Sequence, residues 1–519
     1  MKLHQLLSGI VSGYVTKLIQ LAVSLLLVPF LLREDVLGLD GYGRAFTMSS
    51  VVGLLPLFTE GLGFSFIRGV SRAVDRLDGR GPGEVLGAGL KILGTACAAA
   101  VAATLALSPI VLPLVGLDRS RDVVVAFALA SLLYWVENVF QLLRAPLMAR
   151  GAITFVNGVG AAEVTLRALA YLGIFTLWPA TLTTYFAIHL SVALLRGLAQ
   201  LLYLASRWPG DLRGWRHGSW TMGRASIRQS WPITAQIGCD VLVHRLPTIL
   251  ANRLLGPEAS GLVALAVNTI RGYVLQSLLA VLQPIAVPLA SRLDPRQLSP
   301  GRRELLWHLE GIYVLVSGFL VTSALVCMPD LIRGWLGATY AALVTPAQAM
   351  LVASGIELAF NARLSLLIGQ GLLGSAIPGL LFAALVSVFV SSFFIAGPGS
   401  WQLAVLGVAL YFPISCSLGI DAAFRRQLAT GALAARPRFK PLSFLIGVGA
   451  VAWLLAPNAA GEGLASLGLR IAANSIALLL FAHLLLLPLS RVAFTLRTLR
   501  YSLNSRILAD PPDAGSKPS

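Results

Sequence analysis

Charged residues are scarce in this sequence. Only 12% of its 519 residues are Asp, Glu, Lys or Arg, whereas an ordinary soluble domain contains about 25%. Hydrophobic residues make up 56%, and the mean hydropathy is +0.79. A soluble fold cannot bury so much apolar surface, so the composition excludes a soluble globular protein.

Motifs for chemistry are lacking as well. The four cysteines lie in apolar segments without metal-ligand spacing, which predicts packing residues rather than disulfides or a metal site: Cys97, Cys239, Cys327 and Cys416. The sequence contains no nucleophile-base-acid set, Gly-rich phosphate cradle or nucleotide-fold motif. We therefore predict no catalytic residue, metal or cofactor, and a protein that is not an enzyme.

Long apolar runs recur from Leu6 to Leu496, and they lack the two-residue alternation of a membrane β-barrel. Since a bilayer core of about 30 Å needs roughly 20 apolar residues per helix, the runs predict an all-α polytopic membrane protein with about 14 transmembrane helices. The first run has no small-residue cleavage site, so we expect a retained helix rather than a signal peptide. The predicted spans are 8–32, 43–69, 86–115, 122–147, 155–177, 182–206, 229–253, 259–290, 304–328, 342–365, 373–397, 402–424, 440–457 and 469–496.

Basic residues follow the positive-inside rule through these spans. Alternate loops and flanks carry about 27 Lys and Arg in one set and 6 in the other, which predicts that both termini are cytoplasmic. The net charge of +17 is spread between apolar runs rather than over one folded surface. It therefore indicates membrane topology, and no nucleic-acid partner is predicted.

Two stretches of the sequence resemble each other. Pro29, Gly38, Gly41 and Ser71-Arg72 recur in the same order as Pro247, Gly256, Gly261 and Ser291-Arg292. Duplicated halves are common in transporters, so we predict two six-helix lobes related by internal pseudo-symmetry, with two extra C-terminal helices. The expected organisation is an N-terminal lobe at 1–206, a cytoplasmic interfacial connector at 207–228, a C-terminal lobe at 229–426, helices thirteen and fourteen at 427–498, and a disordered cytoplasmic tail at 499–519.

The connector mixes tryptophan with arginine, a combination typical of the lipid headgroup region. It contains Trp208, Trp215 and Trp220 among several arginines. A loop that binds a partner protein is the alternative.

Ionisable residues inside the predicted helices are the main functional signal. Each costs at least about 2.5 to 3.5 kcal/mol at bilayer depth, so each is expected to face a cavity or a partner. We predict that four cations bind an anionic, phosphate-bearing substrate in a central cationic cavity: Lys17, Arg167, Arg245 and Arg271. Candidates for coupling to H⁺ or Na⁺ are Glu60, Glu137, Asp240, His244, Glu357 and Asp421.

Structural roles compete with these assignments. Glu163 and Arg167 stand at i,i+4 and could neutralise each other, as could Asp240 and His244. The acidic residues could all serve only as partners of the cations. Arg196 lies near enough to a helix end for its charge to reach the interface.

Several loop motifs stand out: Leu37-Gly38, Gly41-Tyr42-Gly43, the stretch Gly61-Leu62-Gly63-Phe64-Ser65-Phe66-Ile67-Arg68-Gly69-Val70-Ser71, and in the second lobe Arg253-Leu254-Leu255-Gly256-Pro257-Glu258 with Gly261. They resemble the loop motifs of the polysaccharide-type, Wzx-like flippases of the multidrug/oligosaccharidyl-lipid/polysaccharide exporter superfamily. No family motif fixes the positions of the cavity cations.

The resemblance implies a transporter that flips a polyprenyl-pyrophosphate-linked oligosaccharide from the cytoplasmic to the outer leaflet of the bacterial inner membrane, by alternating access, for polysaccharide biosynthesis. The expected partners are this lipid-linked substrate, membrane lipids, and a polysaccharide polymerase with export proteins. A lipid-linked peptidoglycan-precursor flippase and a drug exporter of the same superfamily are alternatives. From a different class, a membrane polysaccharide polymerase or ligase is disfavoured because no predicted outer loop is long.

Overall fold

The structure is a computed structural model that describes residues 3–55, 57, 59, 66, 69–70, 73–74, 81–272, 300–369, 371–397 and 399–429. All regular elements in these ranges are helical, which confirms the predicted all-α class. The helices predicted at 440–457 and 469–496 and the predicted tail at 499–519 lie outside the described residues, as do Glu60 and the Ser71-Arg72 and Ser291-Arg292 pairs.

Two lobes of helices make up the described chain. The N-terminal lobe contains α1 (Leu3–Leu31), α2 (Gly38–Val52), α4 (Pro82–Leu114), α5 (Arg121–Ala149), α6 (Ile153–Leu177) and α7 (Leu182–Arg207). The connector contains α8 (Pro209–Arg213) and the 3₁₀ turn η1 (Gly214–His217). The C-terminal lobe contains α9 (Trp220–Leu255), α10 (Pro257–Ala264), η2 (Leu265–Ile270), α12 (Pro300–Trp335), η3 (Ala338–Leu343), α13 (Val344–Gly369), η4 (Leu373–Ser375), α14 (Ile377–Ala396), α15 (Trp401–Ile414), η5 (Ser415–Asp421) and α16 (Ala422–Ala429).

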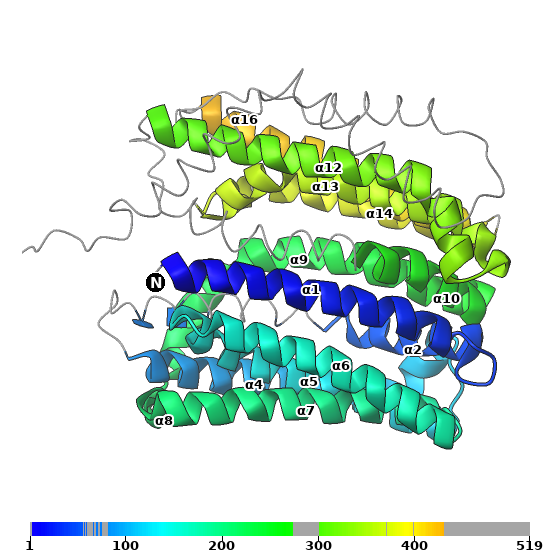
Figure 1. Cartoon of the computed structure of the whole chain (residues 1–519), viewed down its shortest axis with the longest axis horizontal. Helices are drawn as coiled ribbons and strands as arrows, with labels where there is room; N and C mark the ends of the chain where they lie inside the picture. The colour runs from blue at the N-terminus through cyan, green and yellow to red at the C-terminus, as the bar shows by residue number, and fades with distance from the viewer. Residues whose placement is uncertain are drawn as a thin grey trace, which may run out of the picture.

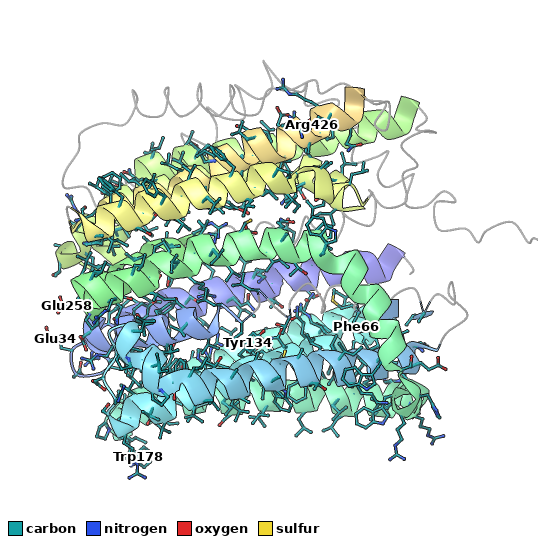
Figure 2. The ribbon with its side chains drawn as sticks, turned by 180° about the vertical axis from the view of Figure 1, so that it is seen from behind. Glu34, Phe66, Tyr134, Trp178, Glu258 and Arg426 are labelled. Atoms are coloured by element: carbon teal, nitrogen blue, oxygen red, sulfur yellow. The ribbon has the colours of Figure 1, made fainter. Side chains whose placement is uncertain are left out.

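Figure 1 shows these helices running side by side along the long axis of the molecule. The blue and cyan helices of the N-terminal lobe occupy one half, α12 to α16 occupy the other, and α9 and α10 lie between them. We call the two ends of the bundle the α8 end, where α1 begins, and the α10 end. Glu34 and Glu258 mark the α10 end in Figure 2, and Arg426 lies toward the α8 end.

Eight helices of the described chain are long and apolar enough to cross a bilayer. They include α4, α5, α6 and α7, together with α14 and the continuous stretch from Trp401 to Gln427. Helices α9 and α12, with 36 residues each, are longer than these eight spans but more polar. The chain is therefore a multi-pass membrane protein.

The start of several helices is fixed by a side chain that accepts a hydrogen bond from a free backbone N–H. Thr181 caps α7 by accepting from Thr184 N at 3.1 Å, and Ser400 caps α15 by accepting from Leu403 N at 3.3 Å. Both caps lie at helix starts that the hydropathy pattern predicted to within a residue or two.

The internal repeat is confirmed in three dimensions. Pro29 and Pro247 lie inside α1 and α9, and Gly38 and Gly256 both adopt positive φ, 66° and 97°, directly before the next helix. Only glycine takes such a conformation readily, which explains its recurrence. The pair α1–α2 thus corresponds to α9–α10.

Three predicted helices are interrupted. The span predicted at 43–69 ends as α2 at Val52 and continues into a turn at residues 53–55. The span predicted at 259–290 changes from α10 to the π-helix η2 at Leu265, and the twelfth span changes to the π-helix η5 at Ser415. Hydropathy does not detect these breaks, because most residues within them are apolar or small.

Candidate substrate site

Helix α1 has one apolar face and one polar face. Val11, Leu18 and Leu26 are exposed along the apolar face, as expected for contact with lipid. A polar stripe lies on the other side of the helix, roughly 90° to 170° around from the mean direction of these three residues. It consists of Ser12, Thr16, Lys17, Gln20 and Ser24.

The polar stripe faces the interior of the N-terminal lobe. Thr16 Oγ1 donates a hydrogen bond to Asn157 O on α6 at 3.0 Å, and Asn157 Nδ2 donates to Ser12 Oγ at 2.9 Å. Lys17 Nζ donates to Gln20 Oε1 at 2.9 Å and forms no ion pair with any described residue. Its positive charge is therefore not neutralised by a neighbouring carboxylate in the described chain.

Helix α5 presents two exposed faces of different character. Val125 and Leu132 form an apolar face, whereas Glu137 and Arg144 are exposed roughly 120° to 140° away from it. Arg144 has no hydrogen-bond or ion-pair partner in the described chain and acts electrostatically on Lys17. Two cations without a carboxylate partner are thus close to each other inside one lobe.

Glu163 on α6 joins two arginines. Its carboxylate lies 3.8 Å from Arg167 Nη1 on the same helix and accepts a hydrogen bond from Arg196 Nη1 on α7 at 2.9 Å. Arg196 and Arg167 also act on the charge of Glu137. The i,i+4 pairing predicted for Glu163 is present, but the shorter contact is to Arg196.

We define the N-lobe cluster as these six side chains: Lys17, Glu137, Arg144, Glu163, Arg167 and Arg196. With four cations and two carboxylates, the cluster carries a formal charge of +2. Such a group inside a membrane-spanning lobe favours an anionic ligand.

A second group of ionisable side chains lies in the C-terminal lobe. Asp240 Oδ1 on α9 accepts a hydrogen bond from Tyr411 Oη on α15 at 2.6 Å. His244 is buried one turn further along α9, with its ring 5.7 Å from that of Phe412 and its Nε2 without a partner in the described chain. The predicted pair Asp240 and His244 is joined through the Asp240 backbone carbonyl, at 2.5 Å from His244 Nδ1.

Arg271 completes this second group. Its Nη2 donates to Glu357 Oε2 on α13 at 2.5 Å, and its guanidinium lies 4.5 Å from the centre of the Phe412 ring. The π-helix η2 ends directly before Arg271, so the change in helix geometry sets the direction of this side chain. We define the C-lobe cluster as Asp240, His244, Arg245, Arg271, Glu357 and Tyr411.

Arg245 connects the C-lobe cluster to the other lobe. A Cβ added to Gly53, at the break after α2, would lie 2.9 Å from Arg245 Nε and 3.3 Å from its Cδ. The guanidinium therefore packs against backbone of the N-terminal lobe, in the space that a missing side chain leaves.

Asp421 belongs to a third, fully paired group. Arg363, only 3% exposed, donates to Glu310 Oε1 at 2.7 Å and also pairs with Asp421, which in turn pairs with Arg425 at 2.7 Å. We call these four residues the Arg363 network. It links α12, α13, η5 and α16, and its formal charges cancel.

The four predicted substrate cations come from both lobes. Lys17 and Arg167 are in the N-lobe cluster, whereas Arg245 and Arg271 are in the C-lobe cluster. Arg167 and Arg271 each have a carboxylate partner. Of the coupling candidates, Glu137 lies in the first cluster, Asp240, His244 and Glu357 in the second, and Asp421 in the Arg363 network.

Sequence reasoning missed Arg144, Glu310 and Arg363. Arg144 and Arg363 were counted among the basic residues of loops, because each stands within about two turns of a helix end. The predicted spans 122–147 and 342–365 already contain the two arginines, close to their ends. The structure places both arginines deeper, because α5 continues to Ala149 and α13 to Gly369.

The two lobes touch closely at the α10 end. Thr47 Oγ1 and Ser260 Oγ are 2.8 Å apart, and Tyr42 Oη and Thr269 Oγ1 are 2.9 Å apart. All four side chains are buried, and each pair joins α2 to α10 or η2. We call this contact the α2–α10 seal.

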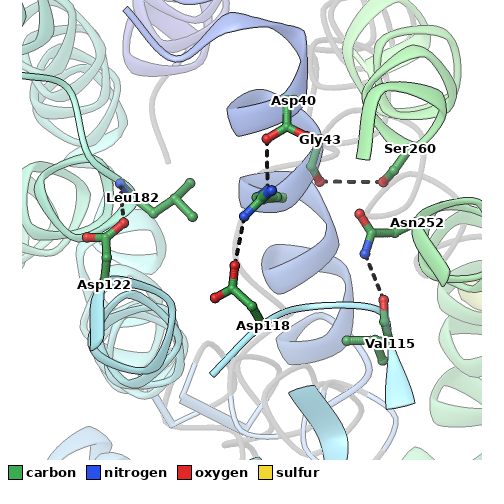
Figure 3. A network of polar contacts seen from close by, with 9 residues as sticks. Asp40, Gly43, Val115, Asp118, Asp122, Leu182, Asn252 and Ser260 are labelled. Carbon is green, nitrogen blue, oxygen red and sulfur yellow. Dashed lines mark hydrogen bonds and ion pairs between the residues drawn. The ribbon is translucent and has the colours of Figure 1, made fainter. Parts of the chain in front are cut away.

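Polar contacts around the seal involve backbone as well as side chains (Figure 3). Ser260 Oγ donates to Gly43 O at 3.4 Å, and Asn252 Nδ2 donates to Val115 O at 2.7 Å. Arg44 bridges Asp40 and Asp118 within the N-terminal lobe, at 2.8 and 3.0 Å. Hydrogen bonds from Ser120, and then the charge of Arg44, hold the pKa of Asp118 in this loop below its ordinary value.

Solved structures of low sequence identity share this fold, whereas no family model and no curated protein matches the sequence. A multidrug resistance MATE family transporter of the MOP superfamily, in an inward-facing conformation, aligns with a TM-score of 0.56 at 13% identity, covering 79% of this chain and 98% of its own. The lipid II flippase MurJ, in an inward closed conformation, gives 0.59 at 9%, covering 91% and 97%. A mutant of the Vibrio cholerae MATE transporter VcmN gives 0.55 at 15%, covering 82% and 95%.

These similarities define a two-lobed, all-α membrane fold that this chain shares with transporters of the MOP superfamily. At 9% to 15% identity they show the fold alone.

Proposed function

We propose that this protein is a flippase that moves a polyprenyl-pyrophosphate-linked oligosaccharide from the cytoplasmic to the outer leaflet of the bacterial inner membrane. The observation that carries the proposal is the pair Lys17 and Arg144, two neighbouring cations of one lobe that form no ion pair with any described carboxylate, Glu163 acting on Arg144 only at longer range. A pyrophosphate group supplies the missing negative charge, and both side chains are suited to bind its oxygens.

The charge of the N-lobe cluster supports this cargo over a cationic drug. A net formal charge of +2 in a medium of low dielectric constant repels a cation and attracts a phosphate ester. Glu163 pairs with Arg167 and Arg196, and we expect an entering pyrophosphate to compete with this carboxylate for the two arginines.

The α2–α10 seal supports alternating access. From the excess of Lys and Arg in the loops at the α8 end we infer that this end faces the cytoplasm, and on that orientation the seal closes the outer side. Transport then requires the two lobes to separate at the seal and to approach each other at the α8 end.

Coupling to H⁺ or Na⁺ is assigned to the C-lobe cluster, chiefly to Asp240 and Glu357. Both carboxylates already have a protein partner, Tyr411 and Arg271, and binding of a cation would compete with those contacts. The cluster lies on the same helix, α9, as Arg245, which contacts the N-terminal lobe at Gly53. We therefore expect a change in the protonation of Asp240 to alter the contact between Arg245 and Gly53, about one helical turn away on α9.

The second candidate cargo is a lipid-linked peptidoglycan precursor, because it carries the same polyprenyl-pyrophosphate group. The fold that this chain shares with the lipid II flippase MurJ supports that alternative. Offering both lipid-linked glycans to the reconstituted protein separates the two cargoes.

The test is flipping of a fluorescent polyprenyl-pyrophosphate oligosaccharide in proteoliposomes, with the export of polysaccharide in cells as a second measurement. A charge-assisted hydrogen bond contributes about 1.5 to 3 kcal/mol, so we expect Lys17→Ala and Arg144→Ala each to weaken substrate binding roughly 10- to 100-fold. Lys17→Arg should retain most of the activity. Arg121→Ala, exposed at the start of the same helix as Arg144, is the matched control and should behave as wild type.

Wild-type flipping by the double variant Lys17→Ala/Arg144→Ala would refute the assignment of the pyrophosphate to this site. Flipping of a cationic drug in place of the glycan would refute the proposed cargo.

A further inference from the structure

The connector between the lobes is clamped to the start of α4. We call residues 207–220 the strap. A Cβ on Gly83 would lie 2.4 Å from Asp211 O, and a Cβ on Gly87 would lie 1.8 Å from Trp215 O. Since these neighbours are backbone atoms, only glycine at both positions permits the strap to lie so close to α4.

Two polar anchors hold the strap. Arg150 donates two hydrogen bonds to the buried carboxylate of Asp211, at 2.8 and 2.7 Å, and its guanidinium lies 5.5 Å from the centre of the Trp208 ring. Lys91 Nζ donates to the backbone carbonyls of Arg216 and Gly218 at 3.1 and 2.9 Å. These contacts fix the backbone, so the remaining strap side chains are held in set directions.

The exposed side chains of the strap are basic and aromatic. Arg207, Arg213 and Arg216 are exposed and form no ion pair with any described residue. Trp215 and Trp220 are 45% and 60% exposed. Asp211 is the one acidic residue of the strap sequence, and it forms an ion pair with Arg150.

The strap lies where membrane helices leave the hydrocarbon. It begins at Arg207, the last residue of α7, and packs on the first turns of α4, at the α8 end of the bundle (Figure 1). Tryptophan and arginine are the side chains that favour the headgroup layer, the first for its amphipathic ring and the second for its charge. The local surface therefore complements a negatively charged lipid surface.

We infer that the strap is a docking surface for the head groups of anionic phospholipids in the leaflet at the α8 end. Arg213 and Arg216 bind the lipid phosphates, and Trp215 and Trp220 insert at the level of the glycerol backbone. This surface is on the outside of the N-terminal lobe and does not depend on the proposed cargo. Its role is to hold that lobe at a fixed depth while the other lobe moves.

Native mass spectrometry of the purified full-length protein tests the inference, with phosphatidylglycerol and phosphatidylcholine as the two probes. Each arginine near an anionic surface strengthens binding about fivefold, so Arg213→Ala/Arg216→Ala should weaken phosphatidylglycerol binding roughly 25-fold. Binding of phosphatidylcholine should not change. Arg213→Lys/Arg216→Lys keeps the charge and should lose only a small part of the affinity.

The matched control is Arg121→Ala/Arg426→Ala, two exposed arginines outside the strap that form no ion pair with any described residue, so that the same charge is removed. An equal loss of phosphatidylglycerol binding in this control would show that only net charge matters, and would overturn the inference. Soluble glycerol phosphate is the second arm: tight binding of this lipid-free head group to the strap would identify a site for a small phosphate compound instead. Unchanged lipid binding in the strap variant would overturn the inference and leave a partner protein as the occupant.

Discussion

Replacing Gly43 with alanine tests whether the α2–α10 seal must open during transport. The new Cβ would lie 1.8 Å from Pro257 O, 2.7 Å from Pro257 C and 2.9 Å from Gly261 N. All three are backbone atoms, so no side chain can rotate away. Restoring a normal contact of about 3.5 Å requires α10 to move by roughly 1.5 Å.

The magnitude follows from the cost of overpacking. Inserting a methyl group into a well-packed contact typically destabilises it by about 1 to 3 kcal/mol. If the open arrangement escapes this cost, the ratio of open to sealed protein rises roughly 5- to 150-fold. The variant should therefore favour the outward-open arrangement and flip the cargo more slowly, because the return to the sealed state is disfavoured.

Labelling of Thr47→Cys by a membrane-impermeant maleimide measures the fraction of protein in which the α2–α10 seal is open. Thr47 is fully buried and its hydroxyl lies 2.8 Å from that of Ser260, so the cysteine should react slowly in the sealed state. We expect the reaction rate to rise 5-fold or more when Gly43→Ala is added. The four native cysteines are buried and provide a low background.

Gly158→Ala on α6 is the matched control, because a Cβ there meets nothing within 4 Å. It should change neither the labelling rate nor transport. Equal labelling of Thr47→Cys with and without Gly43→Ala, together with full transport, would refute the assignment of the seal as a gate.

Two further predictions concern charge pairs. Arg363→Ala leaves Glu310 and Asp421 without their shared cation in a buried site, at a cost of about 3 to 5 kcal/mol, so the midpoint of thermal unfolding should fall by several degrees. Arg425→Ala removes a 70% exposed partner and should change the midpoint little; equal effects would contradict the network. The depressed pKa of Asp118 means that its contribution is lost only as the pH falls through that lowered value, so the small stability difference between wild type and Asp118→Asn should be the same at pH 7 and pH 5. A difference that disappears by pH 5 would show that the pKa of this carboxyl is raised well above its ordinary value, the opposite of the stated direction.

The sequence alone determined the elements that depend on one segment at a time. Apolar runs located the long helices, such as α5 and α7, and the recurring order of Pro29 and Gly38 as Pro247 and Gly256 marked the repeat of α1–α2 as α9–α10. Hydropathy and turn chemistry are properties of neighbouring residues, so they can be read without knowing how the chain folds.

Tertiary structure alone decided how the charges group. Whether Arg363 binds Glu310 or remains in a loop depends on the rotation of α13 about its axis and on residues 53 positions away. The same holds for the separation of Lys17 from Arg271 into two clusters, and for the break that brings Gly53 to Arg245. Pairing energies depend on distances of a few ångströms between segments that are remote in sequence, and composition and spacing do not contain those distances.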